Sequence, residues 1–114
     1  MNIYMENMPI ALTNKALTAT EVIANLAKLD NWHLSGDGAD VVIEKTIRFN
    51  NYAQTMTFVN AVAWLAQARN HHPEWRNVWN TVEIWLWTHD AGGITRADVE
   101  LAVEIGTLAG SRSA

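Results

Sequence analysis

The chain has 114 residues, of which 49% are hydrophobic and 18% charged, with two prolines and six glycines. This composition indicates one compact domain rather than two domains or a disordered chain. The net charge of −4 argues against direct nucleic acid binding and against an anionic membrane as partner. The chain has no cysteine, which excludes disulfides, thiolate metal sites and cysteine nucleophiles.

Two further features of the composition bear on location and packing. No apolar run approaches the roughly 18 residues of a membrane-spanning helix. The first residues lack the features of a signal peptide, so we expect a cytoplasmic protein. Tryptophan is over-represented: six of the ten aromatic residues are Trp, and five of these lie between Trp64 and Trp87.

The first half of the chain predicts one helix and two strands. Residues 1–17 are weakly patterned, and we expect a mobile lead-in before a single domain over residues 18–114. A capping-box pattern at Thr18 precedes apolar residues at helical spacing, which predicts a helix to about Leu29. Residues 32–35 and 41–49 predict two strands around the turn-forming Gly36-Asp37-Gly38. Lys45 interrupts the apolar face of the second strand.

The second half predicts two helices and a hairpin. Asn50 and Asn51 are suitable caps for a long helix to about Asn70. That helix is apolar around most of its circumference, so we expect it to be covered on more than one side. Beyond Pro73, a period of two predicts a hairpin of residues 75–80 and 81–89. A second capping pattern, Thr95 to Asp98, opens a final helix.

The order α-β-β-α-β-β-α predicts an α+β fold, with a four-stranded antiparallel sheet and three helices packed on one face. The opposite sheet face would carry Trp85 and Trp87, where a solvated face would be polar. The long helix also has more apolar surface, including Trp64, than one sheet can cover. We therefore expect the chain to form a homodimer or homotetramer.

Three of the four histidines lie at ends of predicted elements. His71 and His72 end the long helix, and His89 lies where a strand ends. Imidazole suits proton transfer near neutral pH. Because Pro73 biases His72 away from helical geometry, the two neighbouring rings can line two sides of one cleft.

Other interpretations of these residues stay open. The His-His-Pro run is equally compatible with a polar helix end at which imidazole compensates the helix dipole. Three histidines and Glu74 could bind zinc, but no pair has the i, i+4 helical spacing of a zincin-type motif, and we expect no metal. Asp98 by itself is typical of an ordinary capping residue.

Several motifs occur together at fixed spacing in the second half of the chain. They are His71-His72-Pro73-Glu74-Trp75, an aromatic residue four positions after Trp75, Thr88-His89, and Asp98 in the cap of the last helix. Taken together, they resemble the signature of the pterin-4a-carbinolamine dehydratases, and the predicted element order is that family's fold as well. The resemblance extends, more loosely, over roughly residues 17–110.

The resemblance implies that the substrate is a 4a-hydroxytetrahydropterin, which loses water to give the quinonoid dihydropterin during tetrahydropterin recycling. The reaction is a general acid–base dehydration that needs no cofactor. By motif position, His71 and His89 would be the acid–base pair, with the direction of proton transfer undecided. His72 would bind and orient the pterin, Trp75 would form an apolar wall, and Asp98 would hold a histidine.

One position departs from the family pattern. Gln67 lies four residues before the first histidine, where the family usually has an acidic or otherwise charged residue. A neutral amide can orient an imidazole by hydrogen bonding, but it lacks the charge of a carboxylate. We expect activity to survive with an altered pH profile.

Two other functions remain as alternatives. The fold could serve as a non-catalytic oligomeric scaffold, as in the family's second role as a dimerisation cofactor of a homeodomain transcription factor. Otherwise the chain could be a divergent relative whose pocket holds another flat heterocycle.

Overall fold

The computed structural model describes residues 15–110, which form the predicted α+β fold. The first fourteen residues of the expected lead-in lie outside the described residues. The element order confirms the prediction, with two short 3-10 turns, η1 and η2, added. The elements are α3 (Ala19–Leu26), β1 (His33–Ser35), η1 (Gly38–Asp40), β2 (Val42–Arg48), α4 (Tyr52–Arg69), β3 (Glu74–Val78), β4 (Thr81–Leu86), η2 (His89–Ala91) and α5 (Arg96–Ala109).

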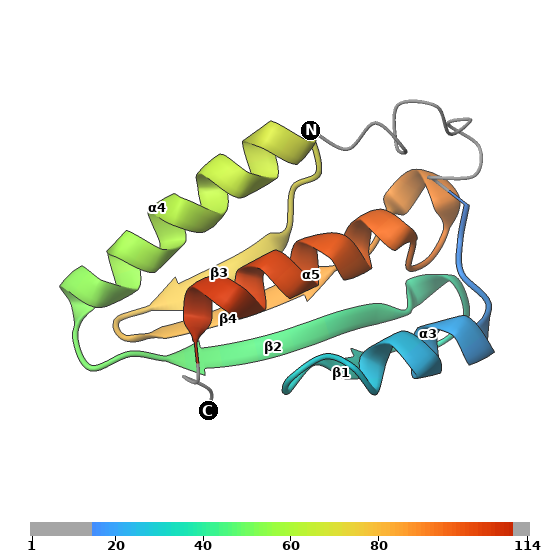
Figure 1. The fold of residues 1–114 in the computed structure, drawn as a ribbon, viewed down its shortest axis with the longest axis horizontal. Coiled ribbons are helices and arrows are strands. Elements are labelled where there is room, and N and C mark those ends of the chain that lie inside the picture. The colour runs from blue at the N-terminus through green and yellow to red at the C-terminus, as the bar shows by residue number, and fades with distance from the viewer. Residues whose placement is uncertain (1–14, 111–114) are drawn as a thin grey trace.

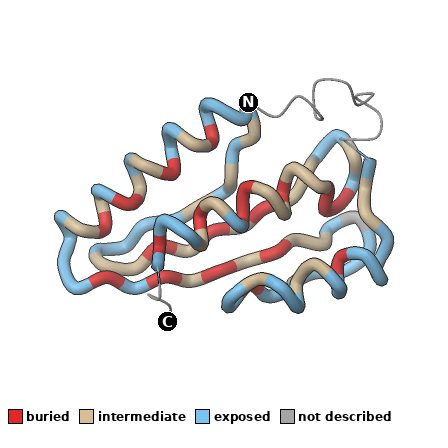
Figure 2. The backbone as a smooth tube through the Cα atoms, viewed as in Figure 1, coloured by how far each residue is buried: buried red, intermediate tan, exposed pale blue. Residues whose placement is uncertain are grey.

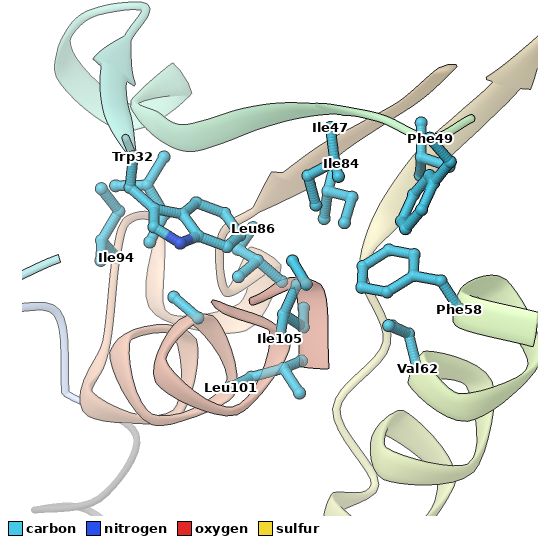
Figure 3. Packing of buried hydrophobic residues seen from close by; sticks show 14 of the residues in the cluster. Trp32, Ile47, Phe49, Phe58, Val62, Ile84, Leu86, Ile94, Leu101 and Ile105 are labelled. Carbon is cyan, nitrogen blue, oxygen red and sulfur yellow. The ribbon is translucent and has the colours of Figure 1, made fainter. Parts of the chain in front are cut away.

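The four strands form one antiparallel sheet in the order β1-β2-β4-β3, and the three helices pack on one of its faces (Figure 1). Burial alternates along the two central strands, β2 and β4, as it does for a sheet covered on one side (Figure 2). The core lies between these strands and the inner sides of the helices (Figure 3). Its largest members include Trp32, Ile43, Ile47, Phe58, Val62, Ile84, Leu86, Leu101 and Ile105.

The capping box of α3 is confirmed. The Glu21 N–H donates to Oγ1 of Thr18, and the Thr18 N–H donates to Oε1 of Glu21, at 3.2 and 2.9 Å. The helix ends at Leu26, so the prediction of about Leu29 was too long. Asn31 adopts a left-handed conformation with φ 60° and reverses the chain, which directs Trp32 into the core.

Lys45, which interrupts the apolar pattern of β2, lies on the core side of the strand. Its side chain is 2% exposed, and Nζ donates to the carbonyl oxygen of Asp30 at 2.6 Å. The core-facing side of β2 predicted from its apolar residues is therefore confirmed, and Lys45 is the charged residue on that side. The buried ammonium fixes the segment between α3 and β1.

The predicted hairpin forms, but both strands are shorter than predicted. Trp79 and Asn80 make the turn between β3 and β4, and Trp79 has φ 52° and is 63% exposed. The prediction that Trp79 belongs to a strand was wrong, because Val78 pairs directly with Thr81 and leaves only two residues for the turn. The strand β4 ends at Leu86 rather than His89.

Helix α4 has the predicted length. Oδ1 of Asn51 accepts from the Gln54 N–H at 2.8 Å at its start, and Asn70, with φ 51°, ends it in the left-handed conformation. One side of the helix is buried, whereas Trp64 is 76% exposed. Within the single chain, then, α4 is covered on one side rather than on several. No helix among residues 15–110 has both the length and the apolar character to cross a membrane.

Candidate active site

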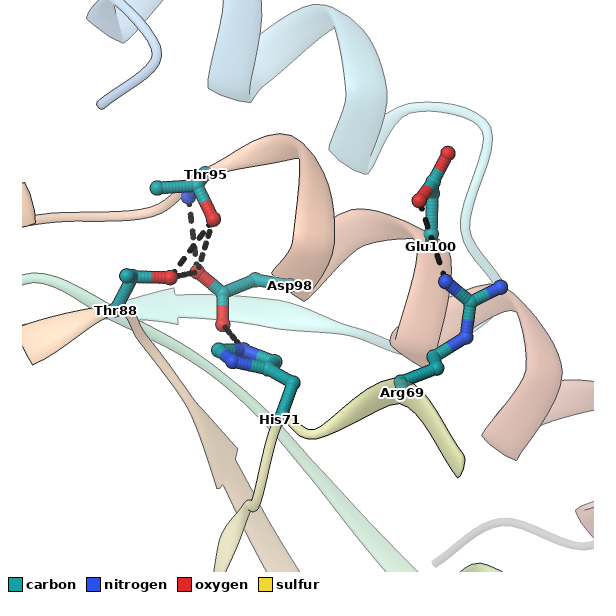
Figure 4. A network of polar contacts seen from close by, with 6 residues as sticks. All are labelled: Arg69, His71, Thr88, Thr95, Asp98 and Glu100. Carbon is teal, nitrogen blue, oxygen red and sulfur yellow. Dashed lines mark hydrogen bonds and ion pairs between the residues drawn. The ribbon is translucent and has the colours of Figure 1, made fainter. Parts of the chain in front are cut away.

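His71 and Asp98 connect the end of α4 to the start of α5. The left-handed Asn70 turns the chain off α4, and the His71 N–H donates to the carbonyl of Ala66 at 3.1 Å. Nε2 of His71 lies 2.5 Å from Oδ1 of Asp98 (Figure 4). The Asp98 side chain is fully buried and that of His71 is 16% exposed, so the pair is largely shielded from water.

The second carboxylate oxygen of Asp98 is held by two threonines. Oδ2 accepts from the backbone N–H of Thr95 and from the hydroxyl of Thr88, both at 2.8 Å (Figure 4). The capping box predicted from Thr95 and Asp98 is therefore present. The carboxylate of Asp98 therefore caps α5 with Oδ2 and contacts His71 with Oδ1.

This arrangement selects the protonated nitrogen of His71. An ionised carboxylate can only accept hydrogen bonds, so with Asp98 ionised, Nε2 of His71 carries the hydrogen. The neutral ring then has its lone pair on Nδ1. The structure thus leaves one defined ring atom of His71 able to accept a proton.

The three predicted histidines line one hollow of about 270 Å³. His71 and His72 come from the segment after α4, and His89 begins η2. The Thr88 N–H donates to the Gly93 carbonyl at 2.8 Å, which closes the loop that carries His89. His72 and His89 are exposed. Asn70, Trp87, Thr88 and Asp90 complete the lining.

Three of the six predicted site residues are not among those that line this hollow: Asp98, which contacts His71, and also Trp75 and Gln67. Trp75 faces the core side of β3, opposite Ile84, and is half-buried against the hydrophobic cluster. Gln67 is exposed on the last turn of α4, and among the described residues no hydrogen bond joins its side chain to His71. Neither residue lines the histidine hollow.

Two residues of the site were missed by the sequence analysis. Thr88 binds the buried carboxylate of a residue ten positions later, and no sequence spacing signals such a contact. Trp87, which was predicted for the open sheet face, lies one residue beyond the end of β4 and lines the hollow, a role that the sequence did not indicate. Within residues 15–110, no three histidine or acidic side chains are arranged so that they could hold a metal ion.

The fold and the hollow define a small α+β domain with three histidines gathered beyond one end of its sheet. The chain belongs to the pterin 4 alpha carbinolamine dehydratase family, whose model matches residues 15–108.

Relatives of the chain carry the provisional name pterin-4-alpha-carbinolamine dehydratase. One from Paracidovorax citrulli is 47% identical over 98 residues, which cover 86% of this chain and 84% of the relative. One from Mesorhizobium japonicum is 41% identical over 91 residues, which cover 80% of this chain and 91% of the relative.

Two solved structures are also similar. A protein from Brucella melitensis, described as a transcriptional coactivator/pterin dehydratase, matches with a TM-score of 0.80 and 30% identity over 84% of this chain and all of the other. A pterin dehydratase-like protein, described as a RuBisCO assembly factor in the alpha-carboxysome, matches with a TM-score of 0.63 and 28% identity over 72% of this chain and 93% of the other.

Proposed function

We propose that this protein catalyses the dehydration of 4a-hydroxytetrahydropterin to quinonoid dihydropterin in the cytoplasm, as a step of tetrahydropterin recycling. The observation that carries the proposal is the gathering of His71, His72 and His89 in one hollow, with His71 held by the buried Asp98. Membership of the pterin dehydratase family supports the class of substrate.

The chemistry asks for one acid and one base. The bond between C4a and the hydroxyl oxygen breaks, a proton joins the leaving hydroxyl to give water, and N5 loses its proton as the C4a–N5 double bond forms. No electrons enter or leave the substrate. A neutral imidazole can accept the proton from N5, and a protonated imidazole can donate one to the leaving hydroxyl. Each positioned acid or base contributes about 10²- to 10⁴-fold to the reaction rate.

We assign the base role to His71, because its contact with Asp98 leaves Nδ1 as the proton acceptor. His89 donates to the leaving hydroxyl, and its exposure lets it regain a proton from water. His72 binds and orients the pterin from the same hollow. In this proposal neither Trp75 nor Gln67 touches the pterin. Trp75 packs against the hydrophobic core from β3, and Gln67 is exposed on α4 outside the hollow.

A binding role in an oligomeric assembly is the second candidate function. It is supported by the description of the Brucella melitensis neighbour as a coactivator and a dehydratase, and of the carboxysome neighbour as an assembly factor. On this chain, the exposed Trp64 of α4 offers an apolar contact that the single chain leaves uncovered. The two functions use different parts of the surface and are compatible.

Stopped-flow measurement of 4a-hydroxytetrahydropterin dehydration tests the proposal. We expect the wild type to accelerate the reaction, and His71→Ala and His89→Ala each to lower the rate about 100-fold or more. His33→Ala is the matched control, because His33 lies on β1 and outside the hollow. A wild type that gives no acceleration over the spontaneous reaction would contradict the enzyme function.

A further inference from the structure

A second hollow adjoins the histidine hollow. The two share Trp87 and His89 as lining residues, so they lie side by side at these side chains, and together they are called the cleft. The second hollow has a volume of about 420 Å³, and its remaining lining comes from Asp40, Val42 and Gly92. The connection between β1 and β2, from which Asp40 comes, borders this second hollow and not the histidine hollow.

Asp40 is the one acidic residue among those lining the second hollow. It is exposed, and among the described residues its carboxylate has no hydrogen-bond or ion-pair partner. Its backbone, in contrast, is fixed: the Asp40 N–H donates to the Asp37 carbonyl at 3.0 Å. The Asp40 carbonyl packs so closely against Gly36 that a Cβ there would lie 2.4 Å from its oxygen. The main chain thus holds an exposed carboxylate, which has no protein partner among the described residues, beside the cleft.

Resting on the proposed function, we propose that the second hollow is the subsite for the pyrimidine edge of the pterin, and that Asp40 recognises the 2-amino group there. A pterin has two fused rings. When its C4a and N5 lie among the three histidines, the pyrimidine ring extends past His89 and Trp87 toward Asp40. The 2-amino group and the neighbouring ring N–H are adjacent donors, and a carboxylate accepts such a pair with its two oxygens.

Trp87 complements this recognition. It lines both hollows, and an indole offers a flat face on which a planar heterocycle can stack. Stacking favours any pteridine, whereas the carboxylate of Asp40 favours those with a donor at position 2. Trp87 therefore contributes affinity for any pteridine ring system, and Asp40 contributes selectivity for a 2-amino group.

Isothermal titration with two stable ligands tests the subsite. Pterin carries the 2-amino group, and lumazine carries an oxygen at that position and is otherwise matched. We expect the wild type to bind pterin at least about tenfold more tightly than lumazine. Asp40→Asn should weaken pterin binding about 10- to 100-fold, because it removes a charged hydrogen-bond acceptor. The dissociation constants for pterin and lumazine should then become nearly equal. In turnover, KM should rise more than kcat falls.

Two control variants separate this effect from a change of net charge. Asp37→Asn removes the same charge three residues away, where the side chain does not line the second hollow, and should leave both dissociation constants unchanged. Asp90 lines the histidine hollow instead. If Asp90→Asn abolishes the preference for pterin and Asp40→Asn keeps it, the assignment to Asp40 is overturned. Trp87→Leu should weaken both ligands by a similar factor, and melting curves check that each variant folds.

The outcomes for the subsite and for the proposed function are distinguishable. If the wild type dehydrates the carbinolamine and Asp40→Asn still prefers pterin, the subsite is wrong and the function stands. If the preference depends on Asp40 but no variant, wild type included, accelerates dehydration, the function is wrong and the subsite stands. A wild type that binds pterin and lumazine equally, or neither, overturns the subsite.

Discussion

His71 and Asp98 meet across the ends of two helices, with Nε2 of the imidazole 2.5 Å from Oδ1 of the carboxylate. The two residues are 27 positions apart, and each follows from a different local signal: a helix end at Asn70 and a capping box at Thr95. Their contact depends on α4 and α5 lying side by side on the sheet (Figure 1). It converts an ordinary capping residue into the group that holds a histidine.

Asp98→Asn should lower the dehydration rate about 100-fold or more, because an amide no longer keeps the hydrogen on Nε2 of His71. Asp98 acts through His71, so the double variant His71→Ala/Asp98→Asn should be no slower than His71→Ala alone. The measurement is a stopped-flow cycle of the four proteins, with a pH profile for each active one. Rate losses that multiply in the double variant would show that Asp98 works independently of His71.

Thr88→Val should destabilise the fold by about 1.5–3 kcal/mol, because it removes a hydroxyl donor from the buried carboxylate of Asp98. Urea unfolding gives the free energy of unfolding. Thr107→Val is the matched control: its hydroxyl donates to the Val103 carbonyl on the exposed side of α5, and its loss should cost less than about 1 kcal/mol. Equal losses in the two variants would rule out a special contribution from Asp98.

Lys45 should make the stability depend on pH in the alkaline range. Burial lowers the pKa of Lys45, and the nearby negative charge of Asp30 opposes this shift in part. Between the pKa of the folded state and the unfolded value of about 10.5, the unfolded chain binds more protons, so the free energy of unfolding rises with pH. Lys45→Met should remove this rise, whereas Lys28→Met, at an exposed position, should keep it.

The comparison for Lys45 is made by urea unfolding at several pH values from neutral to alkaline. The informative quantity is the difference in unfolding free energy between the wild type and Lys45→Met, because other groups cancel in it. As the pH increases, the unfolding free energy of the wild type should rise relative to that of Lys45→Met. A difference independent of pH would mean that Lys45 titrates alike in the folded and unfolded chain.

Arg69 links α4 to α5 two residues before His71. Its guanidinium forms ion pairs with Glu100, at 3.2 Å, and with Glu104. Arg69→Gln should lower the unfolding free energy by about 0.5–1 kcal/mol in low salt, and added salt should shrink the difference, since the pairs are partly exposed. Arg76→Gln, which breaks one exposed pair with Glu83 on the sheet, should cost less. A loss that salt leaves unchanged would point to packing rather than charge.

Trp64 is the test of self-association. Because this indole is 76% exposed on α4, we expect the wild type to sediment as a dimer or tetramer at micromolar concentration, and Trp64→Gln to shift it toward the monomer. Trp79→Gln changes an indole that is similarly exposed but belongs to the hairpin turn and not to α4, and should leave the assembly intact. A monomeric wild type would contradict the expectation directly.

Local signals in the sequence were sufficient for most of the fold. The capping residues Thr18, Asn51 and Thr95 predict where three helices begin, and the alternation in β2 and β4 predicts which side faces the core. The ends were less certain. Helix α3 stops at Leu26, and the left-handed Asn31 turns the chain five residues later. Strand β4 stops at Leu86, two residues before Thr88 pairs with Gly93. Such stops depend on where the next element must pack.

The fold class, the helix starts and the set of three histidines follow from the amino-acid sequence, because capping, periodicity and motif spacing act within a few residues. Three features appear only in the folded chain: Asp98 contacts His71, Trp87 lines the cleft, and Trp75 packs against the core instead. These contacts join residues brought together by the packing of two helices on a sheet. They depend on how the helices and strands are placed relative to one another, and the spacing of residues along the chain does not predict that placement.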